Sequence, residues 1–197
     1  MPYAIDALTA DCYEGTDCLI NKMGIRDAKL LAEVESEITL AKTVLLLDHP
    51  IGGRFDFAHY KAIHRFLFED LYDWAGTIRT VDMSKKGTLF AKAAEIDSMA
   101  TAIFQRLHAM NCFSGLSVDR FAEELVDFYC TTNHLHPFRE GNGRTQRLFL
   151  HELAGSAGYE IRFKDMDPDE LMIATIYAAG GVTDQLLRLF CRYITKK

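Results

Sequence analysis

The residues best suited to chemistry lie between His136 and Arg147, in the stretch His-Pro-Phe-Arg-Glu-Gly-Asn-Gly-Arg-Thr-Gln-Arg. An apolar helical pattern follows over 148–157, so the stretch is predicted to be a loop that opens into a helix. The glycines let successive backbone N–H groups converge at the positive end of a helix dipole. The sequence therefore predicts an anion site at Gly141, Asn142 and Gly143, and phosphate is the expected anion.

Two arginines stand in the first turn of this helix, Arg144 and Arg147. Cations there oppose the helix dipole at a cost of about 0.3–1 kcal/mol each. Their spacing puts them on one face, and with Arg139 nearby they repel one another unless an anion lies among them. Neutralisation by acids such as Glu152 or Asp127 is the alternative, but it leaves the glycines unexplained. We expect both arginines to bind phosphate groups.

A metal ligand and a base complete the predicted site. Glu140 is the only acid in the loop, and Mg²⁺ prefers one or two carboxylates together with phosphate oxygens. His136 has an ordinary pKa near 6.5, so it can be neutral and accept a proton from a nucleophile. A transition-metal site built from His134 and His136, completed by Glu140 or His151, is disfavoured because the spacing matches no metal motif. Phe138 is predicted to be an apolar anchor for the loop.

Composition limits the class of molecule. The chain has 197 residues, 49% of them hydrophobic, which is typical of one globular domain spanning 1–197. A net charge of −6 argues against direct nucleic-acid binding. The five scattered cysteines form no CxxC pair, which indicates a reducing compartment. No leader or membrane-spanning run is found, so we expect a cytoplasmic protein without a membrane partner.

Hydrophobic periodicity predicts a mostly α-helical fold. It has an N-terminal arm and helix over 1–50, a catalytic core over about 55–160, and C-terminal helices over 167–195. The first helix runs from Asp27 to about Asp48, with an expected inner face at Leu31, Val34, Ile38, Ala41 and Leu45. Further helices are expected after the caps Asp56, Ser117, Asp167 and Thr183, the last reaching about Ile194, and near 94–110.

One segment departs from the helical pattern. Between Trp74 and Ala91, β-branched residues flank the turn Ser84-Lys85-Lys86-Gly87, and Gly87 can supply the positive φ of a bulged hairpin turn. We expect a short β-hairpin that stands alone on the helical body and offers an open edge. The alternative is an ordinary polar connector.

The stretch from His136 to Arg147 resembles the Fic family motif HxFx(D/E)GNGRxxR at every fixed position. The resemblance continues through Leu71–Gly76 and the hairpin, which is similar to the family's target-docking flap. It covers about 56–159, and the arm over 13–27 resembles short bacterial members. The flap residues are Lys85, Lys86, Gly87, Thr88, Leu89 and Phe90.

The resemblance implies an all-α Fic-domain bundle with a hairpin flap, and transfer of AMP from ATP to a Ser, Thr or Tyr hydroxyl of a target protein. It implies that His136 takes the hydroxyl proton and that Glu140 holds Mg²⁺ between the α- and β-phosphates. Gly141–Gly143 would form the anion hole. Arg144 would meet the γ-phosphate, and Arg147 would support the phosphates from the same face.

Many family members carry an inhibitory helix with the pattern (S/T)xxxE(G/N), whose glutamate pairs with the arginine equivalent to Arg147. Neither Glu14-Gly15 nor Glu160 fits that pattern. The absence resembles members held inactive by a separate small helical antitoxin, so we expect such a partner near Arg147 and the N-terminal helix. Short relatives modify DNA gyrase and topoisomerase IV subunits, which makes a type II topoisomerase subunit the implied target.

Two other functions stay open. Relatives transfer UMP, GMP, phosphocholine or phosphate, although the phosphate-transferring death-on-curing members depart from the Gly-Asn-Gly sequence that is intact here. A catalytically silent docking module is the second alternative, weakened because every motif position is present.

Overall fold

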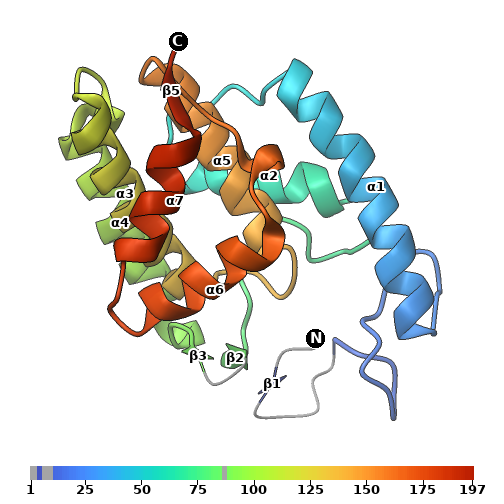
Figure 1. The fold of residues 1–197 in the computed structure, drawn as a ribbon. Coiled ribbons are helices and arrows are strands. Elements are labelled where there is room, and N and C mark those ends of the chain that lie inside the picture. The colour runs from blue at the N-terminus through green and yellow to red at the C-terminus, as the bar shows by residue number, and fades with distance from the viewer. Residues whose placement is uncertain (1–3, 6–10, 86–87) are drawn as a thin grey trace.

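The computed structural model describes residues 4–5, 11–85 and 88–197. These residues form a helical bundle with two small antiparallel sheets, which confirms the predicted fold class (Figure 1). The helices are α1 (Ala28–Asp48), α2 (Phe57–Phe68), α3 (Ile96–Ala109), α4 (Val118–Leu135), α5 (Asn142–Ser156), α6 (Pro168–Ala179) and α7 (Asp184–Tyr193). The strands are β1 (Ala4–Ile5), β2 (Met83–Lys85), β3 (Thr88–Leu89), β4 (Tyr159–Ile161) and β5 (Ile194–Lys196). No helix in these ranges is long and apolar enough to cross a membrane.

The helix starts follow the predicted caps. The predicted caps Asp56, Ser117 and Asp167, and also Asp27 before α1, each accept a backbone N–H of the following turn at a side-chain oxygen. Such a cap typically stabilises a helix by about 1 kcal/mol. Thr183 stands at the cap position of α7 but makes no capping hydrogen bond, because its backbone is already helical.

Helix α5, which follows the loop from His136 to Gly141, is held from three sides. Phe149 of α5 is fully buried. Its ring centroid lies 5.3 Å from that of Tyr60 on α2, 5.6 Å from that of Phe104 on α3 and 5.8 Å from that of Phe128 on α4. Because α5 is packed against several helices, the loop at its N-terminus starts from a fixed base.

Helix α1 lies on the outside of the bundle, and the predicted inner face is partly wrong (Figure 1). Leu31 is buried, but Leu45 is exposed. The buried stripe instead continues through Glu35 and Thr39, each one turn further along the helix. The reason is polar: this stripe faces an arginine of α5, as described below.

The β-hairpin is confirmed, but it does not stand alone. Strands β2 and β3 pair with Ser84 opposite Leu89. The predicted turn residues Lys86 and Gly87 lie outside the described residues. Strand β1 adds to the other edge of β2, giving the order β1-β2-β3. A third strand relieves the instability of an isolated two-stranded ribbon.

The C-terminus forms a strand that the helical periodicity did not predict. Helix α7 ends at Tyr193, and β5 pairs antiparallel with β4, with Ile161 opposite Ile194. Both isoleucines are buried, so the pairing covers apolar surface at the end of the core. This partner strand is distant in the sequence, and local patterns cannot reveal it.

Candidate active site

The loop between α4 and α5 reverses the chain sharply through two left-handed residues, His136 (φ 42°) and Gly141 (φ 78°). A Cβ on Gly141 would lie 2.2 Å from two ring carbons of Phe68, so only glycine fits. The Asn142 side chain closes the loop on itself. Its Nδ2 donates to the Phe138 carbonyl at 2.7 Å, and its Oδ1 accepts the Phe138 N–H at 2.9 Å. The Asn142 amide therefore braces the loop, and only the Asn142 backbone remains for an anion.

The loop is anchored through Phe138 and His64. Phe138 is fully buried and stacks on His64 with 3.7 Å between ring centroids, as the predicted anchor role requires. The Gly76 N–H donates to His64 Nδ1 at 2.8 Å, so His64 Nε2 carries the proton and donates to the Glu140 carbonyl at 3.0 Å. Burial lowers the pKa of His64 to about 3. His64 is thus a neutral, positioning histidine that sequence spacing did not single out.

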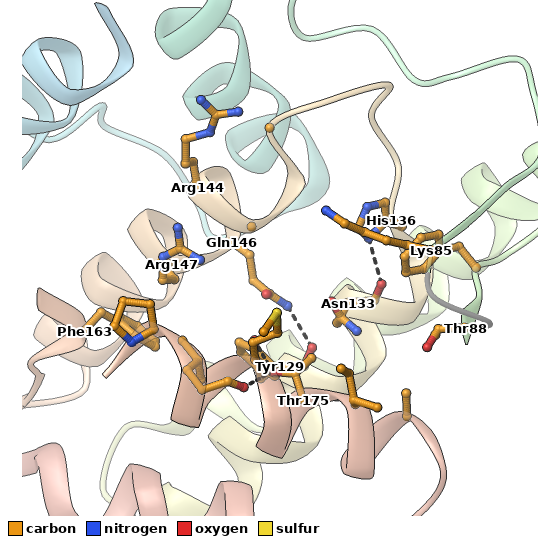
Figure 2. Close-up of a pocket in the computed structure, with 18 of the residues that line it drawn as sticks. Lys85, Thr88, Tyr129, Asn133, His136, Arg144, Gln146, Arg147, Phe163 and Thr175 are labelled. Atoms are coloured by element: carbon orange, nitrogen blue, oxygen red, sulfur yellow. Dashed lines mark hydrogen bonds between the residues drawn. The ribbon is translucent and has the colours of Figure 1, made fainter. Parts of the chain in front are cut away.

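His136 is in the state that a general base needs. Its Nδ1 lies 3.2 Å from the Asn133 carbonyl, so this nitrogen carries the proton and the lone pair is on Nε2 (Figure 2). The ring of Phe90 lies parallel to the imidazole with 3.6 Å between centroids. Burial lowers the pKa of His136 to about 3; the Asn133 bond opposes this, and the charges of Arg79 and Lys85 add to it. The imidazole is therefore neutral at ordinary pH.

Arg79 ties the hairpin to the loop and was missed by the sequence analysis. It is buried, and its Nε donates to the His136 carbonyl at 2.8 Å. Its other guanidinium nitrogens donate to the carbonyls of Val81 and Ala91, which flank the hairpin. Its backbone N–H donates to the Pro137 carbonyl at 2.8 Å. The only signal in the sequence was an arginine among β-branched residues.

Arg144, predicted to meet phosphate, already has internal partners. Its Nη2 lies 2.5 Å from Glu35 Oε1 and 3.3 Å from Glu140 Oε1. Its Nη1 donates to Thr39 Oγ1 at 3.1 Å. The Tyr72 hydroxyl donates to the other oxygen of Glu35, and burial, followed by the Glu35 charge, raises the pKa of Tyr72. Glu35 is therefore a buried counter-ion that positions Arg144.

The acids considered from the sequence as arginine partners lie elsewhere. Asp127 pairs with an arginine of α3, and Glu152 lies 3.1 Å from His59 Nε2. Arg139 points to the N-terminal arm, where its Nε is 3.5 Å from Asp11 Oδ2. The expected repulsion among three arginines is thus relieved for two of them without any bound anion.

Arg147 is the arginine that still needs an anion. It is half-buried, and no carboxylate of the described residues lies within ion-pair distance of it. Burial lowers its pKa, the Tyr129 hydroxyl raises it, and the charge of Arg144 lowers it further. The Arg147 side chain lies over Gly143, where an added Cβ would be 3.2 Å from Nη1. A partly desolvated cation beside a helix N-terminus is a strong anion site.

The site opens into a pocket of about 460 Å³ (Figure 2). One side is polar and carries the loop, the two arginines and His136. The opposite wall is largely apolar and comes from α6 and the turn before it; it includes Phe163, Met166, Leu171, Met172 and Ile176. A ligand with an anionic end and a flat apolar end fits this division.

The flap residues divide between the pocket and the surface. Lys85, Thr88 and Phe90 line the pocket, and Figure 2 shows Lys85 beside His136. Leu89 does not line this pocket and is 74% exposed. The hairpin therefore covers His136 and also leaves one apolar side chain at the surface.

The Glu140 carboxylate lies at the pocket. Its Oε1 accepts the Gly141 N–H at 2.8 Å and also contacts Arg144. Among the residues that the structure describes, no group of three or more His, Cys, Asp or Glu side chains could hold a metal ion. A hard cation bound by one carboxylate needs further oxygens, such as those of phosphate and water, and Mg²⁺ accepts such a set.

Comparison with known sequences gives consistent matches. Residues 54–154 match the Fic/DOC family. The chain is 38% identical over 181 residues to the protein adenylyltransferase VbhT of Bartonella schoenbuchensis, covering 92% of this chain but only 38% of that protein. It is 33% identical over 184 residues to a Salmonella typhimurium protein named "Probable protein adenylyltransferase Fic", covering 93% of this chain and 91% of that protein.

Solved structures agree with the sequence matches. The N-terminal Fic domain of a VirB-translocated effector of Bartonella quintana, with bound ADP, superposes with a TM-score of 0.91 at 31% identity and covers 95% of both chains. The BepC protein of Bartonella tribocorum, with bound AMPPNP, gives a TM-score of 0.88 at 29% identity and covers 95% of this chain and 97% of that one.

Proposed function

Because the chain belongs to the Fic/DOC family, we propose that it is a protein adenylyltransferase, which transfers AMP from ATP to a hydroxyl side chain of a second protein. The observation that carries this proposal is the pocket in which Arg147 and the N-terminus of α5 face the imidazole of His136. The relatives with bound ADP and AMPPNP support an adenine nucleotide as the ligand.

The phosphates bind at the start of α5. The N–H groups of the first turn have no intrahelical acceptor, so those of Asn142 and Gly143 are available to phosphate oxygens. Arg147 supplies the charge that its surroundings leave uncompensated. Arg144, held by Glu35, lies beside them as a second cation. The apolar wall of α6 then receives the base.

The transfer is a displacement at the α-phosphorus. The target hydroxyl gives its proton to Nε2 of His136, and its oxygen forms a bond to the α-phosphorus. The bond from that phosphorus to the oxygen bridging to the β-phosphate breaks, and pyrophosphate leaves with the electron pair. The negative phosphates raise the pKa of His136 above its value in the empty pocket, and the Asn133 carbonyl stabilises the imidazolium that forms.

We propose that Glu140 holds Mg²⁺ against the phosphates. Its carboxylate faces the pocket and is 30% exposed, which leaves it accessible to a cation. When bound, Mg²⁺ neutralises phosphate charge. Release of Glu140 from Arg144 is compatible with this role because Glu35 continues to neutralise that arginine.

We also propose that a separate helical inhibitor packs against α1 near Arg147. Helix α1 leaves Leu40 and Val44 exposed, together with Leu47. Leu47 lines a separate cavity on the α1 side of the site, of about 360 Å³, that extends to Arg147. Glu14 lies in an exposed turn of the arm, not in a helix. A partner helix with a carboxylate at its end would cover the leucines and neutralise Arg147. The five free cysteines support a reducing, cytoplasmic setting for both proteins.

Labelled ATP tests the proposed function. The purified chain is incubated with magnesium and either α- or γ-labelled ATP, in cell lysate and with type II topoisomerase subunits, the target class implied by the resemblance. AMP transfer puts α-label on protein, whereas phosphate transfer puts γ-label there. Absence of both labels would favour a docking module. If the chain alone were inactive and Glu14→Gly restored activity, the separate inhibitor would be excluded.

A further inference from the structure

The hairpin presents one edge next to His136. Strand β2 lies between β1 and β3, so among the described strands β3 is the one at the edge nearest the pocket. The Ala91 N–H, just after β3, donates to the His134 carbonyl at 2.9 Å. Together with the Arg79 bond to Ala91, this contact fixes the edge relative to the last turn of α4. The edge is therefore a rigid guide for an extended peptide.

A second cavity lies next to the nucleotide pocket, beside this edge. It holds about 380 Å³ and is lined by residues of β3, α3, α4 and α6. Thr88, Tyr129, Asn133, Thr175 and Ala179 line both cavities, so the two are adjacent.

The lining of this second cavity is mostly apolar or small. Leu89 comes from β3, Met99, Ala102 and Ile103 come from α3, and Ala178 from α6. Its titratable side chains all come from α4 and are Tyr129, Cys130 and His134. The lining that the structure describes includes no carboxylate, lysine or arginine. A charged side chain would lose its hydration here without an ionic partner, whereas an aliphatic or aromatic one would gain from burial.

Exposed apolar side chains lie beside the groove that the β3 edge and the second cavity form. Leu89 stands on the hairpin side, and Ile176, which also lines the nucleotide pocket, on the α6 side. Ile173 and Tyr177 extend this surface along α6 and are 48% and 51% exposed. Ile173, Ile176 and Tyr177 share one face of α6, and exposed apolar side chains grouped in this way are typical of a protein-binding site.

We propose that this groove binds an extended segment of the target protein and selects a bulky apolar residue two positions from the modified hydroxyl. The inference rests on the proposed function. Side chains two apart lie on the same face of a strand, about 7 Å from each other. When one carries its hydroxyl to His136, the next on that face enters the second cavity. The substrate class is therefore an extended hydroxyl-containing segment with a neighbouring leucine, methionine or phenylalanine.

Peptide substrates and a substitution on α3 test whether the groove selects an apolar residue. Ala102 is exposed on α3 and lines the second cavity, so Ala102→Trp fills the cavity without disturbing the core. Ala109, exposed at the end of the same helix, is the matched control as Ala109→Trp. The substrates are short peptides with a central Tyr, Ser or Thr and with Leu or Asp at the positions two residues to either side. Incorporation of α-labelled AMP is measured for both peptide sets.

The parent chain is expected to label the leucine peptides at least about ten-fold faster than the aspartate peptides, as burial of one apolar side chain predicts. Ala102→Trp should remove that preference and slow labelling of lysate proteins, with AMPPNP affinity unchanged; Ala109→Trp should do neither. Equal labelling of both peptide sets, or an unchanged preference in Ala102→Trp, overturns the proposal that the groove selects an apolar residue. Failure of the proposed function looks different, because then no variant puts α-label on any protein.

Discussion

Replacement of Gly141 by alanine tests whether the loop geometry depends on close packing as well as on backbone conformation. Gly141 has φ 78°, and a Cβ there would lie 2.2 Å from Phe68 Cε2 and Cζ. Phe68 is fully buried, with His64 stacked on it at 4.7 Å and the Arg144 guanidinium 4.8 Å from its ring centroid. The ring cannot move aside freely, so the loop must shift away from it.

The cost has two parts. The left-handed conformation costs an alanine about 1–2 kcal/mol, and overpacking adds about 1–3 kcal/mol. We therefore expect Gly141→Ala to lower the free energy of unfolding by about 2–5 kcal/mol. In a domain of this size, 1 kcal/mol corresponds to about 2–4 °C in Tm. A loop shifted from Phe68 also misplaces the N–H groups of Asn142 and Gly143, so nucleotide affinity should fall as well.

Thermal unfolding and calorimetry with AMPPNP measure both effects. Gly158→Ala is the matched control, because Gly158 has φ 87° with nothing within 4 Å of an added Cβ. It should lose only the conformational part, about 1–2 kcal/mol, and bind nucleotide normally. If Gly141→Ala were no less stable than Gly158→Ala, or bound AMPPNP with the parent affinity, the contact with Phe68 would not define the loop.

Four other predictions have definite expected outcomes. His136→Ala should lower AMP transfer by about 10²–10⁴-fold while calorimetry shows nearly unchanged nucleotide binding; persistent labelling would remove His136 from its role. Burial lowers the pKa values of His136 and His64 to about 3, so between about pH 6.5 and pH 3 the unfolded chain binds more protons than the folded one. Urea titrations should therefore show that the free energy of unfolding decreases as the pH is lowered through this range, by up to about 1.4 kcal/mol per pH unit for each histidine. A free energy of unfolding that does not change over this range would contradict their burial. Arg147→Gln should weaken AMPPNP binding about ten- to hundred-fold, whereas the exposed Arg188→Gln on α7 should leave it unchanged; equal affinities would move the anion site away from Arg147. Glu35→Gln should lower the free energy of unfolding by about 1–3 kcal/mol and raise the Mg²⁺ concentration needed for tight AMPPNP binding, because its arginine would then compete for Glu140; an unchanged Mg²⁺ dependence in calorimetry would reject that positioning role.

The features that the sequence predicted well are local. Helix caps such as Asp56 and Ser117 act on backbone groups within the next turn, and the glycine at 141 acts on its own φ. The loop from His136 to Arg147 is one continuous segment, so its residues could be brought together without knowledge of the fold. The motif, most helix starts and the hairpin could therefore be predicted from the sequence, because they depend on local hydrogen bonding and backbone sterics.

Packing decided which charged groups remain available. Glu35 is 109 positions from Arg144, and Arg79 is 57 positions from His136, yet each pair shares a hydrogen bond. The strand pairings of β1 with β2 and of β4 with β5 are similarly remote in the chain. No periodic pattern reports such contacts, because they depend on how whole helices are oriented when the core closes. The amino-acid sequence alone thus indicated an anion site with a base beside it, and only the tertiary structure showed that Arg144 is already neutralised by α1 while Arg147 has no carboxylate partner among the described residues.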